Sequence, residues 1–195
     1  MSYDIACFFG RPASGKTGPV DDAEKNGYQK RVCSDDVKAY YADPSIVATS
    51  DSGAMWSDET VTTVMGLHLS KDRSGIRGFG LDGYVRSPGQ FAFLMDYVRR
   101  NNWKILVIWI DTPAAVCSSR AETRRQEYIA KGLKPRRDDE PEVHGRRLRE
   151  YDEYGPATIS SFEGAGVPVV RIDGRQSPEQ VILESRSAIM GLVMQ

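Results

Sequence analysis

Gly10-Arg11-Pro12-Ala13-Ser14-Gly15-Lys16-Thr17 matches the phosphate-binding pattern G-x-x-x-x-G-K-[ST] at every fixed position. An apolar run at residues 3–9 precedes this stretch, and a run able to start a helix follows it. In such a strand–loop–helix unit, backbone N–H groups surround phosphate oxygens at the positive end of the helix. The alternative is a glycine-rich turn with a chance Lys-Thr pair, but the preceding strand favours nucleotide binding.

Length and charge narrow the classes of protein. At 195 residues the chain is expected to form one domain. Lys and Arg number 26 against 27 Asp and Glu, which excludes a nucleic-acid binder held by bulk positive charge. Arginine is nevertheless concentrated in one segment, at Arg120, Arg124, Arg125, Arg136, Arg137, Arg146, Arg147 and Arg149.

The cysteines predict no metal site. Cys7, Cys33 and Cys117 lack metal-ligand spacing, and the first two lie in strand-like runs as expected buried thiols. Their odd number, without a signal peptide, indicates a reducing cytosol and a cytoplasmic protein. No apolar run approaches the length of a membrane span.

Short apolar runs alternate with helical patterns along the chain. We expect strands at residues 3–9, 30–34, 78–82, 104–110 and 167–172. We expect helices at 16–25, 35–42 with Ser34 as N-cap, 58–72, 88–101, 113–131, from 139 onward with Pro141 in the first turn, and 178–193. Residues 43–56, rich in Ser, Asp, Gly and Pro, are expected to be a loop. This alternation predicts a three-layer α/β fold with a mostly parallel sheet.

Five blocks carry a family resemblance. They are residues 10–17; residues 55–59, Met-Trp-Ser-Asp-Glu; residues 78–86, Gly-Phe-Gly-Leu-Asp-Gly-Tyr-Val-Arg, with Gln90; residues 110–113 with Arg120 and Arg124; and Arg136, Asp138, Asp139, Arg147 and Leu148. In this order they resemble the adenylate kinases and other nucleoside monophosphate kinases. The resemblance implies a P-loop kinase fold with a five-stranded parallel sheet in the order 2-3-1-4-5. It also implies an acceptor-binding insert at about residues 34–66 and a short lid at about 125–135. Without a cysteine, that lid cannot bind zinc.

The resemblance also implies roles for individual residues. The ATP phosphates would lie against Ala13, Ser14, Gly15, Lys16, Thr17 and Gly18, with Lys16 facing solvent beside the phosphates. Mg²⁺ would be held by Thr17 and by Asp82 through water. Arg120 would stack on the ATP base and Gln176 would contact it by backbone. Lys16, Arg86, Arg124, Arg136 and Arg147 would be catalytic, with Arg86 on the acceptor phosphate. The acceptor would be bound by Ser34, Trp56, Gly83, Tyr84, Val85, Arg86, Gln90, Arg136 and Arg147.

The residues agree with this chemistry, and several have a second interpretation. Phosphoryl transfer collects negative charge, which Lys, Arg and Mg²⁺ neutralise. Gln90 has an alternative role as the capping-box residue of Ser87, and Asp82 could cap a turn, although metal binding is favoured. The arginines expected on a solvated face are Arg125, Arg137, Arg146 and Arg149, and His68 and His144 are expected to be structural or surface residues.

Three positions depart from the family's pattern. The family has an arginine three residues after the aspartate matched by Asp36, where this chain has Ala39, so Arg86 and Lys38 would supply a weak acceptor grip. The order Lys16-Thr17-Gly18 replaces K-G-T, and either order supplies a hydroxyl near Mg²⁺. Tyr84-Val85 replaces F-P, and without proline we expect a trans peptide bond and a slightly different approach of Arg86.

The expected protein is a monomeric, ATP- and Mg²⁺-dependent nucleoside monophosphate kinase that binds small nucleotides and neither nucleic acid nor membranes. AMP is the expected acceptor, because Gln90 offers both a donor and an acceptor to a base edge. Two alternatives remain: a P-loop kinase for another small acceptor, such as a deoxynucleotide or a metabolite, and a nucleotide-binding protein without turnover.

Overall fold

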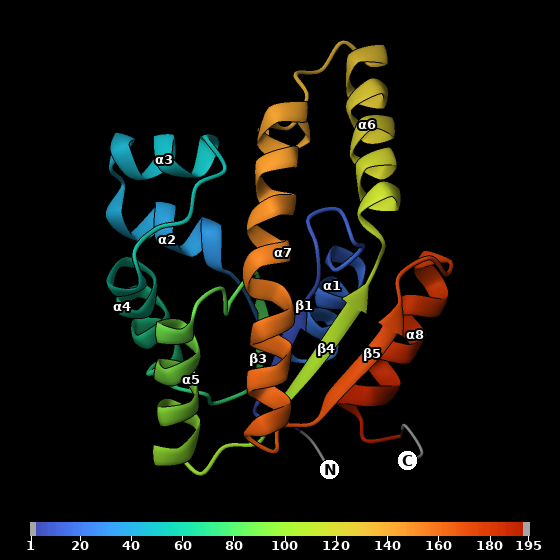
Figure 1. Cartoon of the computed structure of the whole chain (residues 1–195). Helices are drawn as coiled ribbons and strands as arrows, with labels where there is room; N and C mark the ends of the chain where they lie inside the picture. The colour runs from blue at the N-terminus through green and yellow to red at the C-terminus, as the bar shows by residue number, and fades with distance from the viewer. Residues whose placement is uncertain (1–2, 193–195) are drawn as a thin grey trace.

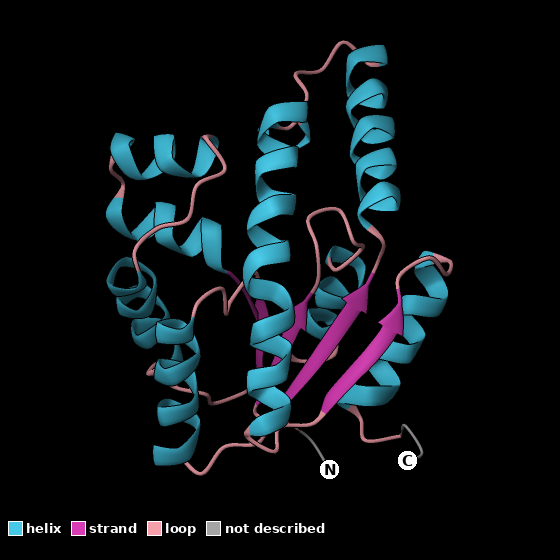
Figure 2. Ribbon diagram, in the orientation of Figure 1, coloured by secondary structure: helices cyan, strands magenta, loops and turns pink. Residues whose placement is uncertain are grey.

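Five parallel strands form one sheet in the order β2-β3-β1-β4-β5, as predicted. The structure is a computed structural model that describes residues 3–192. The strands are β1 (Ile5–Phe9), β2 (Tyr28–Val32), β3 (Gly78–Asp82), β4 (Ile105–Asp111) and β5 (Val169–Asp173). Helices cover both faces of the sheet, so the predicted three-layer α/β fold is confirmed (Figures 1 and 2).

Alternate residues of β1 divide the core into two halves. All five of its residues are buried. Ile5, Cys7 and Phe9 belong to the larger half, which includes residues of α5 (Pro88–Arg100) and α7 (Pro141–Gly164). Ala6 and Phe8 belong to the half that includes residues of α1 (Thr17–Lys25) and α8 (Pro178–Ile189). This period of two is what a strand covered on both faces requires.

Two arms rise from the sheet at the carboxyl ends of the strands (Figure 1). The first arm consists of α2 (Cys33–Tyr41), α3 (Pro44–Asp51) and α4 (Asp58–Leu69). The second consists of α6 (Ala114–Ala130), the short 3₁₀ turn η1 (Arg137–Asp139) and the first half of α7. No helix in residues 3–192 is both long and apolar enough to cross a membrane.

The first arm differs most from the sequence prediction. Residues 43–56 were expected to be a loop, but residues 44–51 form α3, which begins at Pro44 after the N-cap Asp43, whose side chain accepts a hydrogen bond from Ser45 N–H. Helix α2 begins at Cys33, so Ser34 is not its N-cap and Cys33 is not in a strand. The first error arose because the Ser, Asp, Gly and Pro residues of 43–56 are typical both of a loop and of a short capped helix.

The other boundaries differ by a few residues. Helix α7 begins at Pro141, because Asp139 lies in η1 instead of the helix. The lid predicted at residues 125–135 is divided between the last turns of α6 and the connection to η1. Helix α8 ends at Ile189, and the final residue of the prediction, Val193, lies outside the described residues.

The peptide bond between Tyr84 and Val85 is cis, so the predicted trans bond is wrong. The prediction weighed only the local preference of a non-proline peptide bond. In the folded chain both side chains are buried, and the N–H of Arg86 donates to Gln90 Oε1 at 2.9 Å, so tertiary packing and hydrogen bonding fix this segment.

Asp43→Ala should loosen α3 selectively. The variant removes the carboxylate that accepts from Ser45 N–H, and no residue of α3, all of which lies in the described range, is buried to compensate. Amide hydrogen exchange in α3 should become faster by about fivefold, while exchange in the sheet stays unchanged. Ser52→Ala, at the other end of the helix, is the control, and an equal effect from both variants would contradict a specific capping role.

Candidate active site

A cavity of about 680 Å³ opens at the carboxyl ends of the strands, between the two arms. Parallel strands bring the loops that follow β1, β3, β4 and β5 to the same edge of the sheet, where ligands of such folds bind. Seventeen of the predicted site residues line the cavity; they are Ala13, Ser14, Gly15, Lys16, Thr17, Gly18, Ser34, Trp56, Asp82, Gly83, Val85, Arg86, Arg120, Arg124, Arg136, Arg147 and Gln176.

The loop after β1 is held against the end of β4. Gly10 has φ +149°, and a Cβ there would lie 2.5 Å from the carbonyl oxygen of Ile110, so this position requires glycine. The hydroxyl of Thr112 donates to the carbonyl oxygen of Ser14 at 2.9 Å. Ala13 takes a left-handed conformation, with φ +60°. Contacts with Ile110 and Thr112 therefore hold the loop in place at the end of β4.

Lys16 was predicted to face solvent, but its ammonium group is part-buried. Its ammonium group folds back over the loop and donates to the carbonyl oxygens of Gly10 at 2.7 Å and Arg11 at 2.8 Å. Burial lowers the pKa of Lys16 to about 8, against the opposing charge of Asp82. Sequence reasoning did not consider that the loop's own carbonyl groups can accept hydrogen bonds from this ammonium group.

Arg120 joins three elements at the donor side of the cavity. Its Nη1 donates to the carbonyl oxygen of Ser14 at 3.2 Å, and its Nη2 donates to that of Gly174 at 2.8 Å. The guanidinium thus lies over the phosphate loop and beside the turn that carries Gln176, whose side-chain amide donates to Glu184 at 3.3 Å. The resemblance placed these two residues at the ATP base, and the structure brings them to one wall.

The three arginines predicted to neutralise the phosphoryl group come from different segments and line one cavity. Arg124 of α6 donates twice to the carboxylate of Asp139, from Nε at 2.7 Å and from Nη2 at 2.5 Å. Arg147 of α7 pairs with Asp138. Arg136, in the connection before η1, is exposed. Two of the three cations are therefore held by carboxylates of η1.

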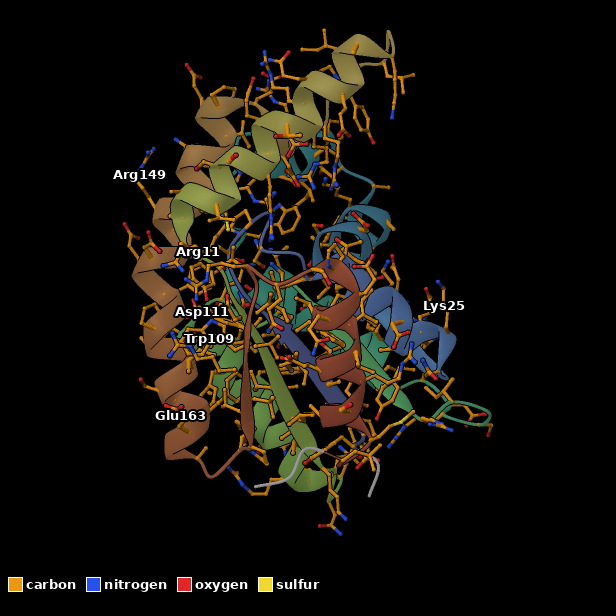
Figure 3. The ribbon with its side chains drawn as sticks, turned by 90° about the vertical axis from the view of Figure 1, so that its right-hand side faces the viewer. Arg11, Lys25, Trp109, Asp111, Arg149 and Glu163 are labelled. Carbon is orange, nitrogen blue, oxygen red and sulfur yellow. The ribbon has the colours of Figure 1, made fainter. Side chains whose placement is uncertain are left out.

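The prediction of four arginines on a solvated face away from the site is correct only in part. Arg125 pairs with Glu122 at 3.3 Å, and Arg149 lies on the outer side of α7, so neither lines the cavity (Figure 3). Arg137, however, lines the cavity and donates to the carbonyl oxygen of Asp51 at 3.2 Å. Arg146 donates to that of Ser52 at 3.1 Å, so two supposed surface arginines join the two arms.

On the acceptor side, Gln90 and Tyr84 do not reach the cavity lining. Tyr84 is buried beneath it. The side chain of Gln90 is also buried: its Oε1 accepts from Arg86 N–H at 2.9 Å, and its Nε2 donates to Asp58 at 3.2 Å. The backbone N–H of Gln90 donates to the hydroxyl of Ser87 at 3.1 Å, as the capping interpretation predicted. Gln90 thus supports the loop that carries Arg86.

The structure places Lys38, and not residue 39, in the lining of the cavity. The prediction placed residue 39 on the pocket side of its helix, but Ala39 is exposed and does not line the cavity, whereas Lys38 and Asp35 do. Asp36, from which the spacing was counted, pairs with Arg31 at 3.5 Å instead. Because α2 begins at Cys33, its inward face is shifted by one residue. Counted from Asp35, the same spacing ends at Lys38.

Thr17 and Asp82 fit a magnesium site shared with phosphates. Both line the cavity, and together they offer one hydroxyl and one carboxylate. Within residues 3–192 no group of three His, Cys, Asp or Glu side chains gathers to hold a metal without other ligands. Mg²⁺ commonly keeps several waters and binds one or two protein oxygens together with substrate phosphates, which is the donor set found here.

Sequence reasoning missed several residues of α7 that line the cavity: His144, Glu150, Tyr151 and Tyr154. They lie three, four or seven positions from Arg147, a spacing that puts residues on the same helix face. Extending the helical pattern from Arg147 would have found them.

Curated relatives cover nearly the whole chain. A protein of Sinorhizobium medicae named adenylate kinase is 33% identical, over 91% of this chain and 95% of its own length. Adenylate kinases of Brucella melitensis, at 31% identity over 90% of the chain, and Agrobacterium fabrum, at 29% over 93%, are similar as well. No family model matches the chain. The chain belongs to the adenylate kinase family.

Membership in the adenylate kinase family makes the chain an ATP-dependent nucleoside monophosphate kinase. The five blocks of resemblance in the sequence are therefore confirmed as a family relationship. In this adenylate kinase family member the phosphate loop, several arginines and residues of the first arm line one cavity.

Gly10→Ala should disrupt the phosphate loop of this kinase. Its Cβ would meet the carbonyl oxygen of Ile110 at 2.5 Å and the hydroxyl of Ser14 at 2.8 Å. Relief of these contacts should cost about 1–3 kcal/mol of stability and displace the loop. Thermal denaturation and tripolyphosphate binding measure both effects. Gly164→Ala, where a Cβ meets nothing within 4 Å, is the control. A variant that binds tripolyphosphate as the unmodified protein does would contradict the requirement for glycine.

Proposed function

We propose that the protein transfers the γ-phosphoryl group of MgATP to AMP. The observation that carries the proposal is a single cavity that holds a phosphate loop and seven cationic side chains besides Lys16. They are Lys38, Arg86, Arg120, Arg124, Arg136, Arg137 and Arg147. Two nucleotides with their phosphates facing each other present a high density of negative charge. Phosphoryl transfer depends mainly on neutralising such charge and on positioning the two oxygens in line.

The donor nucleotide would bind on the side of α1. The phosphate loop supplies backbone N–H groups and the start of α1 supplies the positive end of a helix. Lys16 would leave the carbonyl oxygens of Gly10 and Arg11 for the outer phosphates. Thr17, and Asp82 through water, would hold Mg²⁺, which would supply further positive charge beside the phosphate oxygens. Arg120, already fixed over the loop, would support the base.

The acceptor would bind on the side of α2. Ser34, Trp56, Gly83 and Val85 provide the walls of a base pocket there. Lys38 and Arg86 lie in the same lining and provide positive charge for the monophosphate. Arg86 Nε is buried without a hydrogen-bond partner among the described residues, so the guanidinium retains a donor. The choice of AMP rests on the relatives named adenylate kinase, because the side chain of Gln90 is already bonded to Arg86 N–H and Asp58.

The arginines between the two sites would stabilise the transferred group. Arg124, Arg136 and Arg147 approach from α6, the connection before η1, and α7. Their pairing with Asp138 and Asp139 holds two of them in place before substrate arrives. Because they are held beside the cavity in this way, these two arginines would need only to change partner from carboxylate to phosphate when the nucleotides bind.

The direct test is ADP formation from MgATP with each nucleoside monophosphate as acceptor. AMP should give the largest kcat/KM, and Lys16→Ala should reduce activity with every acceptor to the level of the assay background. A larger kcat/KM with another monophosphate would replace AMP as the acceptor. Turnover by Lys16→Ala equal to that of the unmodified protein would contradict catalysis at the phosphate loop.

Lys38→Ala should raise the KM for AMP by about tenfold, which corresponds to the loss of one charge-assisted hydrogen bond of roughly 1.5 kcal/mol. The KM for ATP should stay the same, because Lys38 lies on the acceptor arm. Ala39→Arg is the matched control and should change neither constant, since residue 39 is exposed outside the cavity. The assignment of the acceptor grip to Lys38 would be wrong if Ala39→Arg lowered the KM for AMP and Lys38→Ala left it unchanged.

A further inference from the structure

His144 is a buried imidazole with neither ring nitrogen bonded. It lies in the first turns of α7, lines the cavity, and is 5% exposed. Both Nδ1 and Nε2 are buried and lack a hydrogen-bond partner within the described chain. Buried polar groups in folded proteins nearly always have a partner, so an unpaired pair of nitrogens in a binding cavity calls for an explanation.

Four charged groups from three segments act on this imidazole. Asp138 and Asp139 come from η1, Arg124 comes from α6, and Arg147 comes from α7 itself. Burial lowers the pKa of His144; Asp139 opposes this effect most strongly, and the two arginines add to it. The neutral imidazole is therefore favoured while each arginine stays beside its carboxylate.

The carboxylate of Asp139 depends on Arg124. Its side chain is 1% exposed, and within residues 3–192 both hydrogen bonds to its oxygens come from that one guanidinium. In the proposed reaction, on which this inference rests, Arg124 turns toward the transferred phosphoryl group. Asp139 would then be a buried carboxylate without its cation, a costly state unless another donor takes over.

We propose that His144 is a positioning residue: it takes up a proton and pairs with Asp139 when bound phosphates draw Arg124 away, so that nucleotide binding is coupled to proton uptake. The proton comes from solvent, binds one ring nitrogen, and returns to solvent when the nucleotides leave. The imidazolium would keep η1 and the start of α7 in place while the arginine is engaged.

The sign of the coupling follows from the charges. Before binding, two arginines and burial favour the neutral ring. After binding, Asp139 loses its cation and phosphate charge enters the cavity, and both changes raise the pKa of His144. A group whose pKa rises on binding takes up protons, so nucleotide affinity should weaken as the pH increases through the range in which His144 titrates.

Calorimetry can count the protons. A bisubstrate compound, two adenosines joined by five phosphates, is titrated with Mg²⁺ into the whole protein at pH 6.5 in two buffers with different ionisation enthalpies. The unmodified protein should take up about one proton more than His144→Gln, because one imidazole changes its charge. Protons bound by the phosphates cancel in that difference. Lys16, with a pKa of about 8, is already charged at this pH. His68→Gln is the matched control and should retain the full uptake.

Nuclear magnetic resonance gives a second measurement on the same samples. The chain has only two histidines, so each variant assigns one set of ring signals. The pKa of His144 should lie below its ordinary value in the free protein and rise on binding, while that of His68 stays fixed. In assays, His144→Gln should flatten the pH dependence of KM for the nucleotides between pH 6 and 8.

The outcomes separate this inference from the proposed function. Suppose that the unmodified protein binds the compound and forms ADP, but the pKa of His144 stays fixed and the proton count equals that of His144→Gln. This result overturns the coupling and leaves the kinase assignment intact. Lower stability of His144→Gln with an unchanged proton count shows a packing role only and overturns it as well. An unmodified protein that neither binds the compound nor forms ADP removes both proposals.

Discussion

Strand β1 is hydrogen-bonded on both sides and buried on both faces, and the position of the active site depends on this. It lies between β3 and β4, and each of its five residues is buried. A chain that leaves such a strand can turn only at the carboxyl edge of the sheet, where the ends of β3, β4 and β5 also lie. The close approach of Gly10 to Ile110 then fixes the phosphate loop against β4. The loop therefore has a fixed place relative to the sheet, as a binding site on a rigid scaffold requires.

Two arginines that line the cavity form ion pairs with carboxylates of η1. Arg124 pairs with Asp139 and Arg147 with Asp138, so carboxylates lie beside two cations that the proposed reaction uses. A cluster of unpaired arginines would repel itself and destabilise the fold in the absence of substrate. The carboxylates keep the arginines near their working positions and must yield to phosphate when it binds. Stability of the free protein and strength of phosphate binding therefore oppose each other in the same residues.

The sheet and the donor site could be predicted because their sequence constraints are local. Buried strands read as apolar runs, and the phosphate loop requires fixed residue types at fixed spacing. The first arm, α2 to α4, could not be predicted to the same degree. Helix α3 has no buried residue within its described length, so no hydrophobic pattern marked it. The sequence also did not show that residue 39, which was expected on the pocket side of its helix, lies outside the cavity lining. Gln90 was assigned to substrate because sequence cannot show that Arg86 N–H and Asp58 already use its side chain.

The arms meet through an arginine-to-carbonyl contact that involves no side chain of α3. Arg137 and Arg146 donate to the carbonyl oxygens of Asp51 and Ser52, at the negative end of that helix. The side chains there can change without removing the two acceptors, provided that the backbone keeps its shape. A substitution of a side chain in α3 should therefore leave this contact between the arms intact, whereas a change in the length of the helix or in Arg137 or Arg146 should break it.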